Sequence, residues 1–166
     1  MKLEGSCHCG AVTFTVNSRT PYPFNHCYCS KCRKAGGGGY SINIMGEYET
    51  LKITGAENIS VYRSRNNHRD LYEEDGLGFS RRSFCKTCGT PLWIYNPRYP
   101  DAVYPVASAI DTALPKAPAG THHMLGYKAS WIPVPDGPTE TQHEFYPDEG
   151  IEQWHRVRGL YEDEEL

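Results

Sequence analysis

Apolar and polar residues alternate with a period of two in the segment that follows the first cysteines. Val12, Phe14 and Val16 alternate with Thr13 and Thr15, which is typical of a strand with one buried face. Similar short runs, separated by turn residues, recur at 41–45, 51–54, 59–63, 82–85, 92–95 and 102–106. The pattern predicts a mostly β fold made of short strands.

Helices are expected to be few and short. The chain contains 12 prolines and 16 glycines, and proline removes a backbone donor while glycine carries an entropic cost. We predict one helical turn at 30–34 and a second helix at 151–158. The segment 113–120, which is rich in Ala and Pro, is expected to be a loop that leads into a strand at 122–126.

The length favours one domain. The chain has 166 residues, close to the roughly 100–150 that are commonest for a domain, and no stretch is typical of a long linker. We expect a single zinc-binding domain over 1–166, with a core at about 3–135 and a C-terminal extension at 136–166.

Composition and charge exclude several classes of protein. With 39% hydrophobic and 22% charged residues the chain is typical of a globular protein, and a net charge of −3 disfavours nucleic acid and anionic membranes as partners. The N-terminus lacks the apolar run of a signal peptide, and no stretch approaches the roughly 20 apolar residues of a membrane span. We expect a soluble, cytoplasmic protein of undetermined oligomeric state.

Seven cysteines fall into three short-spaced groups. In a reducing compartment such spacing favours metal ligands over disulfides. A structural zinc site takes four ligands in a tetrahedron, usually from two short-spaced pairs. The two outer pairs therefore predict one closed structural zinc site, made by Cys7, Cys9, Cys85 and Cys88.

The remaining trio of Cys27, Cys29 and Cys32 cannot fill a tetrahedral sphere alone. Catalytic zinc sites have three protein ligands and an open position. The four outer cysteines therefore predict a structural zinc and the remaining three predict a catalytic zinc, which gives two zinc ions per chain. One alternative is a closed site in which His26, His8 or another histidine joins the trio. A disulfide within the trio is the weaker alternative.

Four ordered motifs carry a resemblance to a known family. They are the segments 5–12, 26–34 and 84–90, and a late His122 followed by Lys128 and Trp131. Over most of its length the chain resembles the glutathione-dependent formaldehyde-activating enzyme family, which also includes centromere protein V. The resemblance implies a β-tent of stacked short antiparallel sheets with zinc at their edges. It also implies the same division of the cysteines into a structural and a catalytic zinc site.

The resemblance implies an activity as well: the addition of glutathione to formaldehyde, formally a carbon–sulfur lyase reaction that gives S-(hydroxymethyl)glutathione. We therefore expect a zinc-dependent enzyme that adds or removes a thiol at a small electrophilic carbon. Its partners would be a small-molecule thiol, with glutathione as candidate co-substrate, and an aldehyde-like electrophile. The alternative is a non-catalytic, zinc-stabilised interaction module.

Other segments are weaker candidates for contact with a ligand. A basic concentration suits binding of the carboxylates of a tripeptide thiol, although a solvated charged loop is the simpler alternative. It comprises Arg63, Arg65, Arg69, Arg81 and Arg82, and the loop 63–70 inside it is a candidate lid. The glycine run 36–39 would offer backbone donors to a ligand or form a flexible turn.

The late histidines and the tryptophans have two interpretations each. Either His122 or His123 is a candidate proton carrier at the zinc pocket, and the alternative is a hydrogen-bonded structural histidine. We expect Trp93, Trp131 and Trp154 to pack in the core and at its rim, because a stacking platform for nucleic acid needs more positive charge around it.

Overall fold

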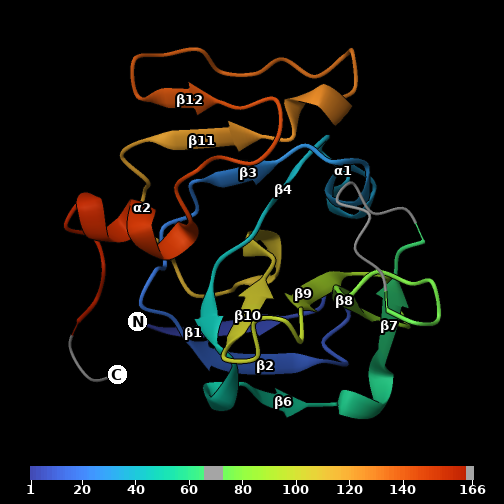
Figure 1. Ribbon diagram of the computed structural model, residues 1–166. Coiled ribbons are helices and arrows are strands. Elements are labelled where there is room, and N and C mark those ends of the chain that lie inside the picture. Colours follow the sequence, from blue (N-terminus) through green and yellow to red (C-terminus); the bar gives the residue numbers. More distant parts are fainter. Residues whose placement is uncertain (66–72, 164–166) are drawn as a thin grey trace.

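The computed structural model describes residues 1–65 and 73–163, and its strands form three small sheets (Figure 1). The first sheet has the order β1-β2-β6 and is antiparallel throughout. Its strands are β1 (Lys2–Ser6), β2 (Thr13–Asn17) and β6 (Lys52–Thr54). Gly5 is required where β1 crosses the core, because a Cβ there would lie 2.4 Å from the Phe14 ring.

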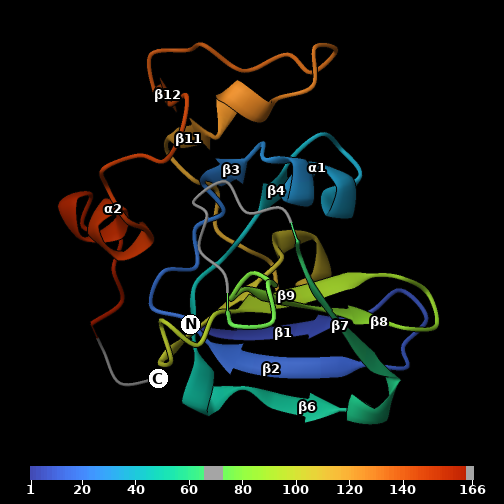
Figure 2. The same ribbon diagram turned by 45° about the vertical axis from the view of Figure 1, so that its right-hand side comes forward.

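The second sheet is the largest. It has the order β5-β10-β9-β8-β7, and all its pairs are antiparallel. Its strands are β5 (Gly46–Glu47), β7 (Ile59–Arg63), β8 (Arg81–Cys85), β9 (Pro91–Tyr95) and β10 (Ala102–Pro105). Figures 1 and 2 both show β8 and β9 beside the β1–β2 sheet. The turns of these two sheets therefore come within reach of each other.

The third sheet is mixed. It has the order β12-β11-β3-β4, and β11 pairs in parallel with both β12 and β3. Its strands are β3 (Asn25–Cys27), β4 (Ser41–Ile42), β11 (Gly120–His123) and β12 (Glu140–Gln142). Strand β12, which comes from the predicted C-terminal extension, lies at the edge, and the sheet forms the end of the molecule away from β6 (Figure 2).

Two short α-helices complete the fold. Helix α1 (Ser30–Gly36) follows β3, and α2 (Ile151–Val157) packs near the segment before β3. The Trp154 ring of α2 stacks on Phe24, with ring centroids 3.7 Å apart. Within the described residues, neither helix is long or apolar enough to cross a membrane.

The main core lies between the first two sheets. Phe14 of β2 meets Trp93 of β9 edge-on, with ring centroids 5.1 Å apart. Around this pair pack further buried residues: Leu3, Cys7, Val12, Val16, Ile44, Cys85, Leu92, Val103 and Ala109. Two of these, Cys7 and Cys85, are cysteines of the outer pairs, so the predicted structural site borders the core.

The prediction of a mostly β fold with few helices is confirmed. The strand predicted at 59–63 and both helices are found, and most other strands match within a residue or two. Strands β1, β3, β5 and β12 were missed, since each is short and carries little alternation. The prediction at 41–45 was too long, because β4 covers only 41–42.

The strand predicted at 122–126 was wrong in its second half. Strand β11 begins at Gly120 and ends at His123, because Met124 adopts a left-handed conformation with φ 62°. A 3-10 helix, Leu125–Tyr127, follows it. The single domain with a core at about 3–135 stays a prediction.

Candidate functional site

The two outer cysteine pairs sit on turns of the same design. The backbone N–H of Cys7 donates to Val12 O and that of Cys85 donates to Thr90 O, both at 2.9 Å. Each turn contains a glycine in the left-handed region, Gly10 with φ 75° and Gly89 with φ 76°, a conformation that other residues adopt at a cost. Each turn thus holds its two cysteines close together.

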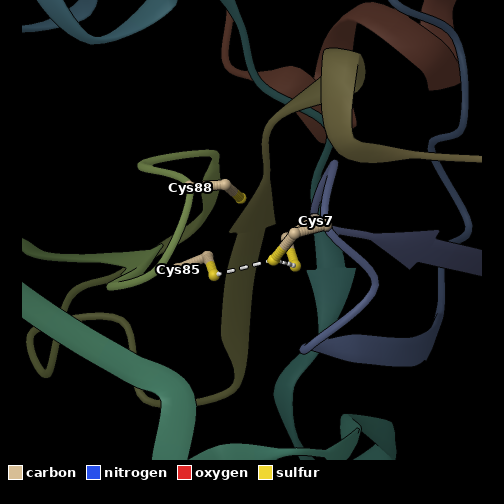
Figure 3. Close-up of side chains that lie close together, drawn as sticks. Cys7, Cys85 and Cys88 are labelled. Carbon is tan, nitrogen blue, oxygen red and sulfur yellow. Dashed lines mark hydrogen bonds between the residues drawn. The ribbon is translucent and has the colours of Figure 1, made fainter.

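The four thiols converge, as the spacing predicted. Their sulfurs lie within 4.8 Å of one another, with Cys7 and Cys9 Sγ 3.5 Å apart and Cys9 and Cys85 Sγ 3.8 Å apart. A tetrahedral zinc with Zn–S bonds of about 2.3 Å implies sulfur separations of about 3.8 Å. Cys7, Cys85 and Cys88 face one another across the gap between the two turns (Figure 3). The donor set fits a closed zinc site.

Local hydrogen bonds favour the thiolate at two cysteines of this cluster, Cys7 and Cys88. The Val12 N–H donates to Cys7 Sγ at 3.2 Å, and the Thr90 hydroxyl lies 3.1 Å from Cys88 Sγ. The contacts with Thr90 lower the pKa of Cys88 to about 5. Cys7 and Cys85 are buried, whereas Cys9 and Cys88 are exposed, so the cluster lies at the edge of the core.

The three remaining thiols come from one loop. Cys27 ends β3, Cys29 is the N-cap of α1, and Cys32 lies in the first turn of α1. Their sulfurs also lie within 4.8 Å of one another, and all three residues are buried. They pack with Met124 in a small cluster apart from the main core. The loop thus offers three of the four ligands that zinc requires.

Cys29 and the neighbouring Arg82 of β8 carry opposite charges beside this loop. Hydrogen bonds from Cys27 and Cys32 hold the pKa of Cys29 far below its usual range, and Arg82 adds to the effect. The same contacts raise the pKa of Cys27. Arg82 Nη2 lies 3.6 Å from Cys32 Sγ. Its guanidinium group therefore compensates thiolate charge.

The loop opens onto a pocket of about 430 Å³. All three cysteines line it, together with Arg82 and its register partner Ile94 on β9. Two further cations, Lys31 and Arg98, stand at the same pocket, and residues 146–151 of the C-terminal segment form part of its wall. Asp148 and Glu149 in this wall also line the pocket, so its charged lining is three cations and two carboxylates.

Among the described residues, His123 is the histidine that lines this pocket. It pairs with Cys27 in the β11–β3 register and lines the pocket beside Cys27 and Cys29. Its side chain is buried, and neither ring nitrogen has a hydrogen-bond partner among the described residues. Burial lowers its pKa to about 4. A neutral imidazole without a partner is thus available to a ligand.

His122 and His26 point to the opposite face of the same sheet. They pair with each other in the β11–β3 register and line a second pocket with Tyr28, as strand alternation requires. His8 lies on the turn of the four-cysteine cluster. Neither His26 nor His8 is therefore placed to close the three-cysteine site, and His123 is the histidine beside it.

The predicted arginine group is divided by the structure. Arg82 lines the pocket, whereas Arg63 and Arg81 bind Glu73 at 3.0 and 3.2 Å. Arg65 is exposed and does not line the pocket. Arg69 and most of the loop 63–70 lie outside the described residues.

The glycine run does not reach the three-cysteine pocket. Gly37 caps α1 with φ 75°, and Gly39, with φ 94°, packs against Ile132. Trp93 and Trp154 are core residues as predicted, while Trp131 is 67% exposed.

Sequence reasoning missed three features of the pocket. Lys31 lies between Cys29 and Cys32 in the sequence, so its position could have indicated that it lies at the pocket. Arg98 and the 146–151 wall gave no such signal, because they reach the pocket only through the fold of the chain.

The family model and a curated relative point to the same family. The family model described as "Glutathione-dependent formaldehyde-activating enzyme" matches residues 2–124. A Halomonas elongata protein named "Putative glutathione-dependent formaldehyde-activating enzyme" is 49% identical over 164 residues, covering 98% of this chain and 99% of its own length. A crystal structure of a Rhodobacter sphaeroides protein is 26% identical with a TM-score of 0.49, covering 69% of this chain and 92% of that chain.

Proposed function

The chain belongs to the glutathione-dependent formaldehyde-activating enzyme family, and we propose that it is a zinc-dependent enzyme of the carbon–sulfur lyase type. It would add a thiol such as glutathione to a small aldehyde such as formaldehyde, or run the reverse reaction. One observation carries the proposal: three buried thiols, a histidine with no hydrogen-bond partner among the described residues, and three cationic side chains line one pocket. The proposal places the protein in the cytoplasm, where thiols stay reduced.

Each cysteine group has its own part in the proposal. Cys7, Cys9, Cys85 and Cys88 would hold a structural zinc, since four sulfurs at these separations complete a tetrahedron. Cys27, Cys29 and Cys32 would hold the catalytic zinc. A zinc ion at this loop would supply an open coordination position that ionises a thiol near neutral pH.

Cationic side chains would orient the thiol substrate. Glutathione carries two carboxylates, and Lys31, Arg82 and Arg98 line the pocket. A guanidinium group binds a carboxylate in a bidentate manner. Arg82 also contacts Cys32 Sγ, so it links the binding of an anionic substrate to the charge of the cysteine loop.

His123 would carry the proton that the reaction moves. The new bond joins sulfur to the carbonyl carbon, the π pair of the carbonyl becomes a lone pair on oxygen, and the thiol proton ends on that oxygen. A neutral imidazole accepts a proton at one nitrogen and donates one from the other. With a pKa of about 4, His123 is neutral at physiological pH, and neither of its nitrogens has a hydrogen-bond partner within 1–65 and 73–163.

The proposal is tested by measuring the reaction of glutathione with formaldehyde by NMR. The enzyme should raise the rate above that of the uncatalysed reaction. Cys29→Ala should reduce turnover by about 100-fold or more while leaving a folded protein with one zinc. The control is Lys34→Ala, because Lys34 is exposed near the end of α1. A Cys29→Ala protein with wild-type turnover would remove the enzyme assignment from this loop.

The non-catalytic interaction module remains the second candidate, and His123 decides between the two. If His123 completes a closed Cys₃His site, the second zinc is structural. His123→Asn would then lose zinc from the loop. Under the enzyme proposal the variant keeps two zincs per chain and loses turnover.

A further inference from the structure

A chain of hydrogen bonds crosses the third sheet on the face opposite to the cysteine pocket. The Tyr28 hydroxyl lies 2.9 Å from His122 Nδ1, and His122 Nε2 lies 2.8 Å from Glu140 Oε2. Tyr28 and His122 are each 1% exposed. Two buried polar side chains are thus satisfied through a single carboxylate on β12.

The chain has one consistent direction of donation. A tyrosine hydroxyl keeps its proton at neutral pH, so the Tyr28 hydroxyl donates to His122 Nδ1. With Nδ1 as the acceptor, the N–H of His122 lies at Nε2 and is donated to the Glu140 carboxylate. Each donor faces an acceptor, which is what a rigid buried network requires.

The network ends at the backbone of the cysteine loop. Tyr28 stands between Cys27 and Cys29, and its own N–H donates to His123 O at 3.0 Å. On the other side of Cys27, the His26 ring stacks on His122 with centroids 4.6 Å apart. Both neighbours of Cys27 are therefore held by the face that the cysteines do not use.

The fold makes room for this contact at Gly120. A Cβ on Gly120 would lie 2.0 Å from Glu140 Oε2 and 3.2 Å from His122 Nε2. Glu140 lies beyond residues 2–124, which the family model matches. A side chain from the C-terminal segment thus completes a network that begins inside the cysteine motif.

We propose that Glu140, acting through His122 and Tyr28, is a positioning residue that fixes the backbone between Cys27 and Cys29 and slows metal loss from the three-cysteine loop. The inference rests on the proposed binding of metal at that loop. Partners behind a metal site commonly contribute about 10-fold to 100-fold to metal affinity. Because this network acts through the backbone, we expect the lower end of that range.

Metal release tests the inference without any measurement of turnover. The full chain is loaded with Zn²⁺, and release to a chromophoric chelator is followed in time, with Cys29→Ala identifying the phase that belongs to the three-cysteine loop. Glu140→Ala and Tyr28→Phe should each accelerate that phase about 10-fold. The phase of the four-cysteine cluster should not change, which also shows that the fold is intact.

Two further variants separate the hydrogen bond from the carboxylate charge. Glu140→Gln keeps an acceptor for the His122 N–H and should restore slow release. Gly120→Ala removes no partner but displaces the carboxylate, so it should release metal as Glu140→Ala does. Glu144→Ala, which removes an exposed carboxylate from the same segment, is the matched control.

The outcomes separate this inference from the proposed function. Unchanged release in Glu140→Ala would overturn the inference and leave the proposed function standing. Equal acceleration of both phases would overturn it as well, because Glu140 would then stabilise the whole fold. A wild-type chain that binds one zinc only would overturn both.

Discussion

The four-cysteine cluster and the three-cysteine loop are both built from cysteine side chains, but different parts of the fold hold them. The four-cysteine cluster joins a turn of the first sheet to a turn of the second, so its metal would hold two sheets together. The three-cysteine loop is one continuous segment, and it opens onto a pocket. A closed coordination sphere between two sheets is typical of a structural zinc site, and an incomplete coordination sphere at a pocket is typical of a catalytic one.

The side chains around the two cysteine groups also differ in a way that separates a structural from a catalytic role. The thiols of the first cluster contact a backbone N–H of Val12 and the hydroxyl of Thr90. The thiols of the second contact Arg82 and lie beside His123. Neutral donors stabilise thiolates in a fixed state, whereas a cation and an imidazole can also act on a substrate.

The largest expected effect is on folding, and it would separate the two groups most clearly. Cys85→Ala should abolish the cooperative unfolding transition, because a structural zinc contributes about 10–16 kcal/mol in small zinc domains, similar to the whole stability of about 5–15 kcal/mol of a typical domain. Circular dichroism during thermal denaturation measures it. Cys29→Ala is the control and should unfold cooperatively; equal damage in both variants would erase the distinction between the groups.

The next effect is on turnover. His123→Asn should lower kcat by about 100-fold, since a positioned proton carrier contributes roughly that much or more. Steady-state kinetics with glutathione and formaldehyde measures it, and His8→Asn, on the turn of the other cluster, should behave as wild type. A His123→Asn enzyme with unchanged kcat would show that the proton moves by another route.

Arg82 should give a smaller effect. Arg82→Gln removes the charged contact to Cys32 Sγ and should raise the KM for the thiol about 10-fold, as expected for a hydrogen bond to a charged group. Arg82→Lys should recover part of the loss. Arg81→Gln is the matched control, because Arg81 binds Glu73 instead; an equal rise in KM there would assign the effect to net charge alone.

The smallest effect lies outside both cysteine groups. His155 in α2 is fully buried, accepts from the Tyr22 N–H at 3.3 Å and contacts Ile151 O at 2.8 Å. Burial lowers its pKa, so the unfolded chain binds the proton first as the pH falls below about 6.5. Stability should be full above that pH and decrease below it.

The contribution of His155 to acid sensitivity is measured by thermal denaturation at pH 7.5 and 5.5, with the same metal content in both samples. His155→Gln should lose fewer degrees of Tm between the two conditions than the wild type does. An identical loss in both proteins would place the acid sensitivity elsewhere, for example in the cysteine groups.

The proximity of the thiols within each short-spaced pair could be predicted because it depends on local spacing. Turns such as Cys7-x-Cys9 and Cys85-x-x-Cys88 present two thiols together whatever the rest of the fold does. The role of a particular histidine could not be predicted. His122 and His123 are adjacent, and only the pairing of β11 with β3 decides which one faces Cys27.

The roles of the arginines and of the C-terminal segment could not be predicted from the sequence either, because they depend on long-range contacts. Arg81 and Arg82 are neighbours in sequence, but one binds Glu73 and the other lines the pocket. Glu140 lies far along the chain from His122's partner Tyr28, and β12 is too short to show alternation. These contacts depend on which strands pair, which a single sequence does not specify.

The central claim is that one cysteine group supports the fold and the other supports the chemistry. The most direct test is to remove zinc in steps with a chelator while recording zinc per chain, circular dichroism and turnover on the same sample. The account predicts two zincs per chain, with the first released from the three-cysteine loop, turnover lost at that step and the fold kept until the second is released. Loss of both zincs in a single step with unfolding, or turnover that survives the first release, would contradict it.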